Sequence, residues 1–210
     1  MEKIMSLIEK YIDSIDYGEP IFSNDIHEYV INKINNADKL VINEYIRRYS
    51  KDNPNFLRYK KGIYYRAKST LFGPSVINQM KLIDRIYLSE GNVVQGYETG
   101  PSLINKIGLT TQVPRYSFYA SNKNRVSYSN NSIKILKPVT KITNENYKYL
   151  QILDVIDNKY EVPFEVHNPQ EIIRNLMDEN DLDFEHLLYY AVFYKDDKIY
   201  KKIAELARRD

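Results

Sequence analysis

Hydrophobic periodicity in the N-terminal quarter of the chain limits the fold more than any other feature. Segments 2–15, 23–34 and about 37–51 each place apolar residues at i, i+3 and i+4, so each has one apolar helical face. A Gly-Glu-Pro stretch at 18–20 ends the first pattern, and two asparagines at 35–36 separate the second from the third. The sequence therefore predicts three consecutive helices.

A basic hairpin is expected directly after the third helix. Residues 56–59 and 63–66 are strand-like, and Lys-Lys-Gly at 60–62 turns between them. Three helices followed by a basic two-stranded hairpin is the element order of a winged helix-turn-helix. In that fold the third helix enters the major groove of DNA and the wing contacts the flanking backbone. We therefore expect a winged helix-turn-helix DNA-binding domain over residues 1–70.

The remainder of the chain, residues 71–210, is predicted to be a second domain with a different pattern of secondary structure. Its first part, 71–143, is expected to be mixed α/β, and its last part, 144–210, helical, so the predicted fold class is α+β. Helices are expected over 74–88, 99–107, 144–157, 169–179, 183–195 and 198–208. Strands are expected over 92–96, 115–121 and 125–136, with a hairpin turn at Asn130-Asn131.

Charge is distributed unevenly although the net charge is only +2. Residues 39–68 carry nine Lys or Arg against two acidic residues, and residues 99–144 carry seven against none. Residues 145–210 reverse the balance, with nine basic and fifteen acidic residues. Two basic blocks are the electrostatic pattern of a nucleic-acid binder, whereas the acidic region could dock a basic partner.

Composition limits the compartments in which the protein is expected. The chain has no cysteine, which excludes disulfides and thiolate metal sites and is consistent with a reducing compartment. No apolar run approaches the ~20 residues that span a bilayer, and the N-terminus lacks the apolar region of a signal peptide. We expect a cytoplasmic protein that does not bind membranes.

The sharpest functional signal is a polar strip on the predicted third helix. Lys39, Asn43 and Arg47 recur every four residues, opposite the apolar face. Lys and Arg can bond guanine or phosphate, and Asn can bond adenine. The alternative is an ordinary solvated helix face, but the basic hairpin that follows favours DNA.

The complete set of expected DNA contacts extends from this strip into the hairpin and the second basic block. Whether that second block extends the footprint or only solubilises the surface stays open. The expected residues are Lys39, Asn43, Arg47, Arg48, Lys51, Arg58, Lys60, Lys61, Arg66, Arg115, Lys123 and Arg125.

Signals for catalysis are weak. The three histidines share no ligand spacing: His27, His167 and His186. No GxGxxG, P-loop, HExxH or GxSxG motif is present. Four carboxylates could be imagined as nuclease metal ligands, but no lysine follows at the spacing of a restriction-type core: Asp154, Asp157, Glu161 and Glu165. We expect no catalytic residues, no cofactor and no metal, and therefore not an enzyme.

Two stretches resemble the AbiEi family of bacterial antitoxin-repressors. Residues 57–65, Leu-Arg-Tyr-Lys-Lys-Gly-Ile-Tyr-Tyr, resemble the wing of that family. Within residues 96–114, the run Gly-Leu-Thr-Thr-Gln-Val-Pro at 108–114 is similar to a family motif. The resemblance covers about residues 1–140. The helix before Gly108 departs from the Ala-rich family version, and the tail from 144 is not matched.

The resemblance implies the antitoxin of a type IV toxin–antitoxin pair associated with phage abortive infection. It implies a winged helix that binds inverted repeats of double-stranded promoter DNA and represses transcription. It also implies that the C-terminal part neutralises a nucleotidyltransferase-like toxin without needing a tight complex. The alternative, drawn from the residues alone, is a winged-helix interaction adaptor that docks a partner through its acidic C-terminal region.

Overall fold

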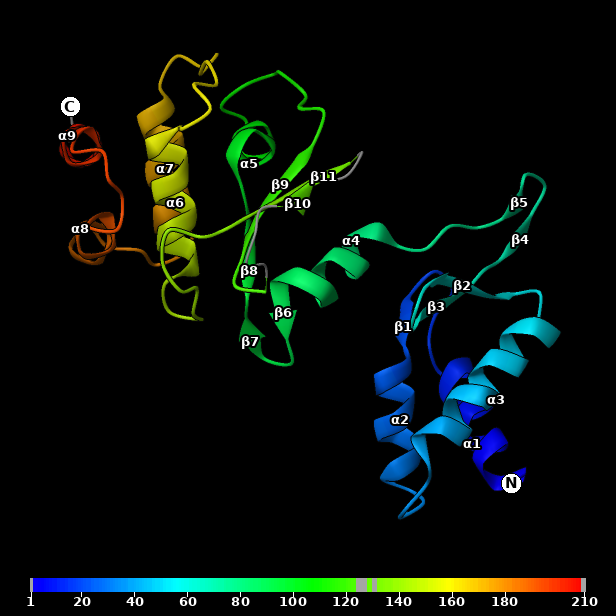
Figure 1. Ribbon diagram of the computed structural model, residues 1–210. Helices are drawn as coiled ribbons and strands as arrows, with labels where there is room; N and C mark the ends of the chain where they lie inside the picture. The colour runs from blue at the N-terminus through cyan, green and yellow to red at the C-terminus, as the bar shows by residue number, and fades with distance from the viewer. Residues whose placement is uncertain (1, 124–127, 130–131, 209–210) are drawn as a thin grey trace. The chain divides into compact units, whose positions relative to one another are not determined.

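The computed structural model describes residues 2–123, 128–129 and 132–208. The chain is an α+β protein whose contacts divide it into two compact units, Met1–Asp84 and Arg85–Asp210 (Figure 1). Within the described residues, no helix has both the length and the apolar character needed to cross a membrane.

The first unit continues past residue 70, where we expected it to end. The backbone N–H of Asn78 donates to the carbonyl oxygen of Gly18 at 2.8 Å. Lys81 Nζ also lies 2.6 Å from Glu19 Oε1. These contacts attach the segment after the predicted hairpin to the loop after the first helix, so it belongs to the same unit.

Up to Arg66, the first unit contains three helices and a three-stranded antiparallel sheet. Its elements follow in this order: α1 (Glu2–Asp13), β1 (Pro20–Phe22), α2 (Ser23–Ile31), α3 (Lys39–Asp52), β2 (Phe56–Lys60) and β3 (Ile63–Arg66). In the sheet, β3 lies between β1 and β2. The three helices and the basic hairpin predicted from periodicity are confirmed.

One apolar core holds these elements together. It draws side chains from all three helices and from the sheet: Ile8, Ile12, Ile21, Ile26, Val30, Ile42, Ile46, Phe56 and Tyr64. The rings of Phe56 and Tyr64 stack with centroids 5.1 Å apart, which joins β2 to β3 inside the core. The apolar faces found in the sequence are therefore the faces that are buried.

Local side-chain chemistry sets the bounds of α3. The side chain of Asp38 caps its first turn by accepting a hydrogen bond from the backbone N–H of Leu40 at 2.7 Å. At the other end Asn53 is extended and precedes Pro54, which disfavours helical geometry at the residue before it. The helix therefore presents one fixed set of side chains between these two points.

The predicted helix over 74–88 is only partly present. Residues 69–74 instead form a small hairpin of β4 (Ser69–Thr70) and β5 (Gly73–Pro74), closed by Thr70 Oγ1 donating to the carbonyl oxygen of Gly73 at 2.6 Å. Helix α4 (Gln79–Ile83) begins after Asn78 and runs into a π-helical turn, η1 (Asp84–Leu88). The prediction was wrong for 74–78 because Pro74 is paired in a strand and Asn78 caps the helix.

The second unit contains a four-stranded mixed sheet. Its strands are β8 (Gly96–Thr99), β9 (Ser117–Ser121), β10 (Tyr128–Ser129) and β11 (Ile133–Leu136). They lie in the order β10-β11-β9-β8, with β9 and β11 parallel and the other pairs antiparallel. A short hairpin, β6 (Ser89–Glu90) with β7 (Val93–Val94), precedes them. The expected turn at Asn130-Asn131 lies outside the described residues.

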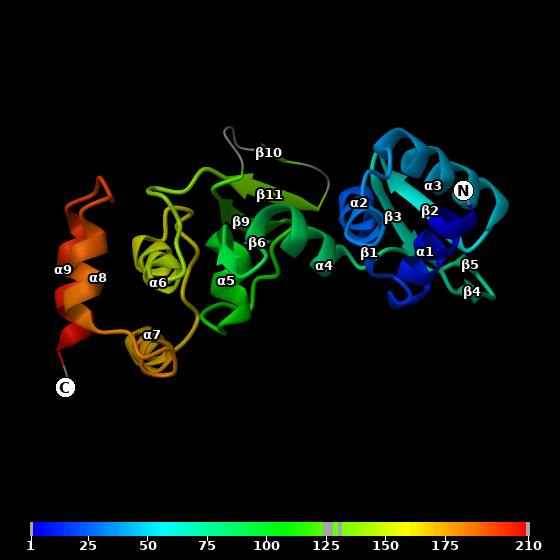
Figure 2. The ribbon, with the colours of Figure 1, turned by 90° about the horizontal axis from the view of Figure 1, so that it is seen from below.

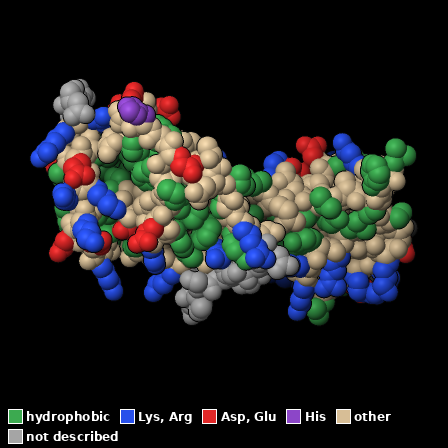
Figure 3. Space-filling view, turned by 90° about the horizontal axis from the view of Figure 1, so that it is seen from above, with side chains coloured by type: hydrophobic (Ala, Val, Ile, Leu, Met, Phe, Trp, Pro, Cys, Tyr) green, Lys and Arg blue, Asp and Glu red, His purple; other side chains and the backbone are tan. Residues whose placement is uncertain are grey.

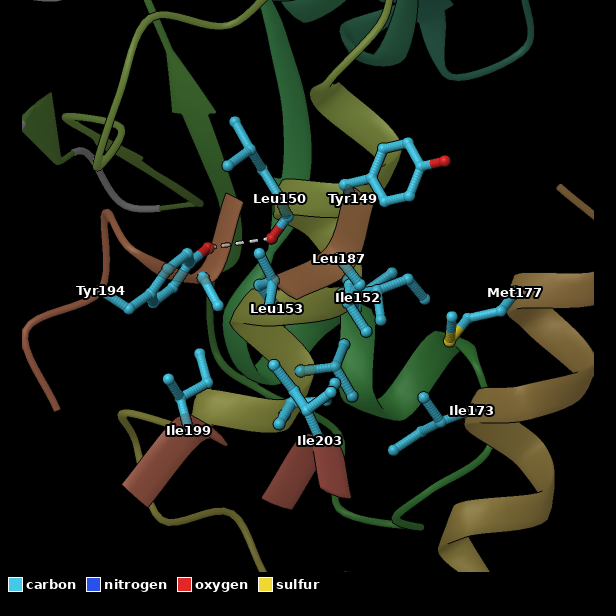
Figure 4. Packing of buried hydrophobic residues seen from close by; sticks show 14 of the residues in the cluster. Tyr149, Leu150, Ile152, Leu153, Ile173, Met177, Leu187, Tyr194, Ile199 and Ile203 are labelled. Atoms are coloured by element: carbon cyan, nitrogen blue, oxygen red, sulfur yellow. Dashed lines mark hydrogen bonds between the residues drawn. The ribbon is translucent and has the colours of Figure 1, made fainter. Parts of the chain in front are cut away.

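Five helices follow within the described part of the second unit and build the larger core, with α5 and α6 packed against the sheet. They are α5 (Gly100–Lys106), α6 (Tyr147–Asp157), α7 (Pro169–Asp178), α8 (Phe184–Ala191) and α9 (Lys198–Ala207). Figure 2 shows α6 between the sheet and the α8–α9 pair. Figure 4 shows Leu150 and Leu153 of α6 in one cluster with Leu187 of α8 and Ile203 of α9. Helix α6 is buried on most sides, which is consistent with the apolar majority of its residues.

Candidate nucleic-acid interface

Helix α3 has an exposed polar strip on the flank beside its buried side. We expected this strip opposite the buried side, but successive helical residues are about 100° apart, so Asn43 lies next to Ile42 and Ile46. Ile42 and Ile46 are buried. Lys39, Asn43 and Arg47 are exposed, as the four-residue spacing predicted. We call the exposed set Lys39, Asn43, Arg47 and Lys51 the α3 face. Figure 3 shows Lys and Arg side chains gathered in a row along one edge of the first unit, at the lower right of that view.

The side chain of Asn43 is hydrogen-bonded to a buried histidine of α2. His27 Nε2 lies 3.1 Å from Asn43 Oδ1, and His27 is only 7% exposed. With the proton on Nε2, the ring donates to Oδ1 and leaves the Asn43 amino group facing solvent as a donor. Sequence reasoning treated His27 as an isolated histidine and missed this role.

A carboxylate within the same helix binds two of the expected DNA-contacting arginines. Glu44 accepts hydrogen bonds from Nε and Nη2 of Arg47 at 2.7 and 2.6 Å, and from Nε of Arg48 at 2.9 Å. These two guanidinium groups lower the pKa of Glu44 to about 2. Glu44 was absent from the predicted interface, although its i+3 and i+4 spacing from the arginines is a known signal for such pairs.

The β2–β3 hairpin presents cations without acidic partners. Arg58, Lys60 and Lys61 are exposed, and no acidic side chain of the described residues forms a salt bridge with any of them. Gly62 turns the chain with a φ of +75°, a left-handed value that glycine adopts without strain. The hairpin therefore offers charge that is available to an anionic partner.

Arg66 does not belong to this interface, contrary to the prediction. Its Nη1 donates to the carbonyl oxygens of Asp13 and Ile15 at 3.0 and 2.9 Å. Its guanidinium also lies 4.4 Å from the centre of the Tyr17 ring, and only 20% of its side chain is exposed. Arg66 therefore satisfies carbonyl groups at the end of α1 and joins that helix to β3.

The three expected DNA contacts of the second basic block have different surroundings. Lys123 Nζ donates to the carbonyl oxygen of Ser89 at 2.7 Å and lies 3.7 Å from a Glu90 oxygen, so it is engaged within the second unit. Arg115 is exposed beside the ring of Tyr116. Arg125 lies outside the described residues. The α3 face and the hairpin remain as the candidate interface.

Asp154, one of the carboxylates considered for a nuclease, is bound by three hydroxyl groups. Asp154 accepts hydrogen bonds from Tyr97 Oη at 3.0 Å, Thr99 Oγ1 at 2.6 Å and Tyr194 Oη at 2.5 Å. Burial raises the pKa of Asp154, while the three hydroxyl donors oppose that rise. Among the described residues, no group of three His, Asp or Glu side chains is placed to hold a metal ion.

The Gly-Leu-Thr-Thr-Gln-Val-Pro run has a structural partner in the tail. Glu165 Oε2 accepts from Thr110 Oγ1 and from both the backbone N–H and Oγ1 of Thr111, at 3.1, 2.7 and 2.6 Å. Gln112 Nε2 lies 3.3 Å from Glu165 Oε1. These donors lower the pKa of Glu165 to about 2. The run therefore fastens the loop after α5 to the segment between α6 and α7.

Comparison with known proteins adds no family assignment. No protein-family model matches the chain, and a search of curated proteins gives no match. The candidate interface therefore depends on its own geometry and charge.

Proposed function

We propose that the first unit is a winged helix-turn-helix that binds duplex DNA, and that the protein is a sequence-specific transcriptional repressor. The element order, with β3 lying between β1 and β2, supports the fold. The observation that carries the function is the α3 face: Lys39, Asn43 and Arg47 are all exposed along one flank of the helix, beside the buried Ile42 and Ile46.

In this proposal α3 lies in the major groove. Asn43 and Arg47 reach base edges, and Lys39 and Lys51 reach phosphates near the two ends of the helix. Arg58, Lys60 and Lys61 form the wing and neutralise phosphates beside the groove. Phosphate contacts position the protein, whereas the Asn43 and Arg47 contacts would select the sequence.

Binding to the DNA upstream of the protein's own gene tests the proposal. We expect Arg47→Ala to lose about 1–3 kcal/mol of binding free energy if it reads a base. Affinity should also fall steeply as salt rises, because counterions are released from each contacted phosphate. Lys10→Ala is the matched control, since it removes one exposed charge from α1 of the same unit. Equal losses for both variants would remove the α3 face from the proposal.

We also propose that the repressor is the antitoxin of an AbiE-like type IV pair that acts in phage defence. This part is supported by the resemblance of residues 57–65 and 108–114 alone. Co-expression with a nucleotidyltransferase-like toxin encoded next to it should restore growth. Arg47→Ala should keep this rescue while losing repression. Absence of rescue would remove the antitoxin role and leave the repressor intact.

A further inference from the structure

Helix α8 is mostly apolar after its first turn, but it is only half enclosed. Its inner residues Leu187 and Ala191 are buried in the core of the second unit. Four large apolar side chains on α8 and the turn after it remain exposed: Leu188 at 44%, Tyr189 at 65%, Val192 at 64% and Phe193 at 42%. We call these four residues the α8 strip. Large apolar side chains that gather on an exposed surface commonly mark a site of protein–protein contact, so the strip is a candidate docking surface.

The four side chains form one patch because their spacing follows the helix. Leu188 and Val192 are four residues apart, as are Tyr189 and Phe193. The Tyr189 ring packs edge-on against Tyr190 at 5.1 Å between centroids. Tyr190 in turn packs on Tyr149 of α6 at 5.4 Å. These ring contacts restrict the Tyr189 side chain in the unbound protein, which reduces the side-chain entropy lost on binding.

The start of α8 is also firmly anchored. The Asp183 side chain caps the helix by accepting from the backbone N–H of His186 at 2.8 Å. Tyr149 Oη donates to the same carboxylate at 3.0 Å. The N–H and hydroxyl donors around Asp183 hold its pKa at about 2, so this residue remains negative at neutral pH.

Acidic residues outnumber basic ones around the strip, most clearly before α8. After the strip, Asp196 and Asp197 lie between the exposed Lys195 and Lys198. Residues 181–197 contain five acidic side chains and one lysine, and all six are exposed. The acidic residues are Asp181, Asp183, Glu185, Asp196 and Asp197. A second copy placed face to face would set these like charges against each other. A partner with positive charge around an apolar centre would find complementary charge.

We propose that the α8 strip is the docking surface for a basic protein element, namely an amphipathic helix with an apolar side and Lys or Arg flanks. The apolar side covers Tyr189 and Val192, and the flanking cations face the acidic border. The surface belongs to the second unit, so this inference does not depend on DNA binding by the first.

The test uses the full chain and a labelled amphipathic peptide of leucine and lysine. Fluorescence anisotropy should detect binding that weakens as salt rises. The combined variant Tyr189→Ser/Val192→Ser should bind roughly tenfold or more weakly, since exposed anchors of this kind dominate such interfaces. Val113→Ser is the matched control, because Val113 is 85% exposed elsewhere in the second unit. It should bind the peptide as the wild type does.

Three outcomes would overturn the proposal. The first is equal peptide binding by the wild type and the double variant. The second is equal binding of a peptide in which glutamate replaces lysine. The third is self-association of the chain that Val192→Ser abolishes, which would assign the strip to a second copy. Should the double variant unfold, Asp196→Asn/Asp197→Asn removes only exposed charge and must weaken peptide binding on its own.

Discussion

Arg47 presents its guanidinium to Glu44, with Nε and Nη2 at 2.7 and 2.6 Å from the two carboxylate oxygens. Both side chains are about half exposed, at 52% and 43%. The proposed DNA-binding face therefore carries one negative charge at its middle. The ion pair orients the Arg47 side chain, and in the proposed complex DNA would compete with Glu44 for it.

We predict that Glu44→Gln strengthens binding to duplex DNA by about fivefold at low salt, because a charge that repels phosphate is removed. The slope of log affinity against log salt should also become steeper, by up to about one. Salt titrations of the wild type and the variant measure both quantities. Glu28→Gln on α2 is the control, and it should leave the slope unchanged.

His27 should act on sequence preference through Asn43. His27→Ala frees the carboxamide to rotate, so we predict a loss of discrimination between operator and single-base variants of about 1–3 kcal/mol. Binding to nonspecific DNA should change little, since His27 is buried and contacts no phosphate. In an Asn43→Ala background the His27 substitution should have no further effect on discrimination. Additive losses in this double-mutant cycle would show that the two residues act separately.

We expect Arg66 to contribute to the free energy of unfolding and not to the affinity for DNA. We predict that Arg66→Ala lowers the free energy of unfolding by about 1–3 kcal/mol, because charged hydrogen bonds to the Asp13 and Ile15 carbonyls are lost. Urea unfolding measures this change. Arg58→Ala, at an exposed position of β2, should give the reverse result, with stability kept and DNA affinity reduced. A folded Arg66→Ala protein with weakened DNA binding would contradict the structural role.

Glu165 should make the second unit sensitive to acid. Its pKa falls from an ordinary 4.5 to about 2 in the folded chain, so its contribution to stability is complete above pH 4.5. That contribution is lost as the pH falls from 4.5 towards 2, because the carboxylate must be protonated. We predict that Glu165→Gln flattens the dependence of unfolding free energy on pH in this window. Identical pH profiles for the wild type and Glu165→Gln would show that the Thr111 contacts contribute nothing.

Local patterns in the sequence account for most of the helices and for the α3 face. The four-residue spacing of Lys39, Asn43 and Arg47 already placed them in one strip, because a helix repeats every 3.6 residues whatever surrounds it. The expectation that this strip lies opposite Ile42 and Ile46 was wrong, since the same repeat places it beside them. The same local reasoning failed at 74–78, where Pro74 pairs in a strand with Ser69. Local reasoning also could not identify the α8 strip as exposed, since a run of apolar residues reads the same whether or not another element covers it.

Sequence alone thus determined the helices of the first unit, the basic hairpin and the charge carried by each region, because these depend on neighbours within a few positions. Only the tertiary structure decided which of those charged side chains face solvent and which are bonded within the chain. Arg66 finds its acceptor 53 residues away, Glu165 finds Thr111 54 residues away, and Lys123 finds Ser89 34 residues away. The sequence does not distinguish a cation that is hydrogen-bonded to a distant carbonyl from one that faces solvent. Only folding brings the distant partner within hydrogen-bond distance.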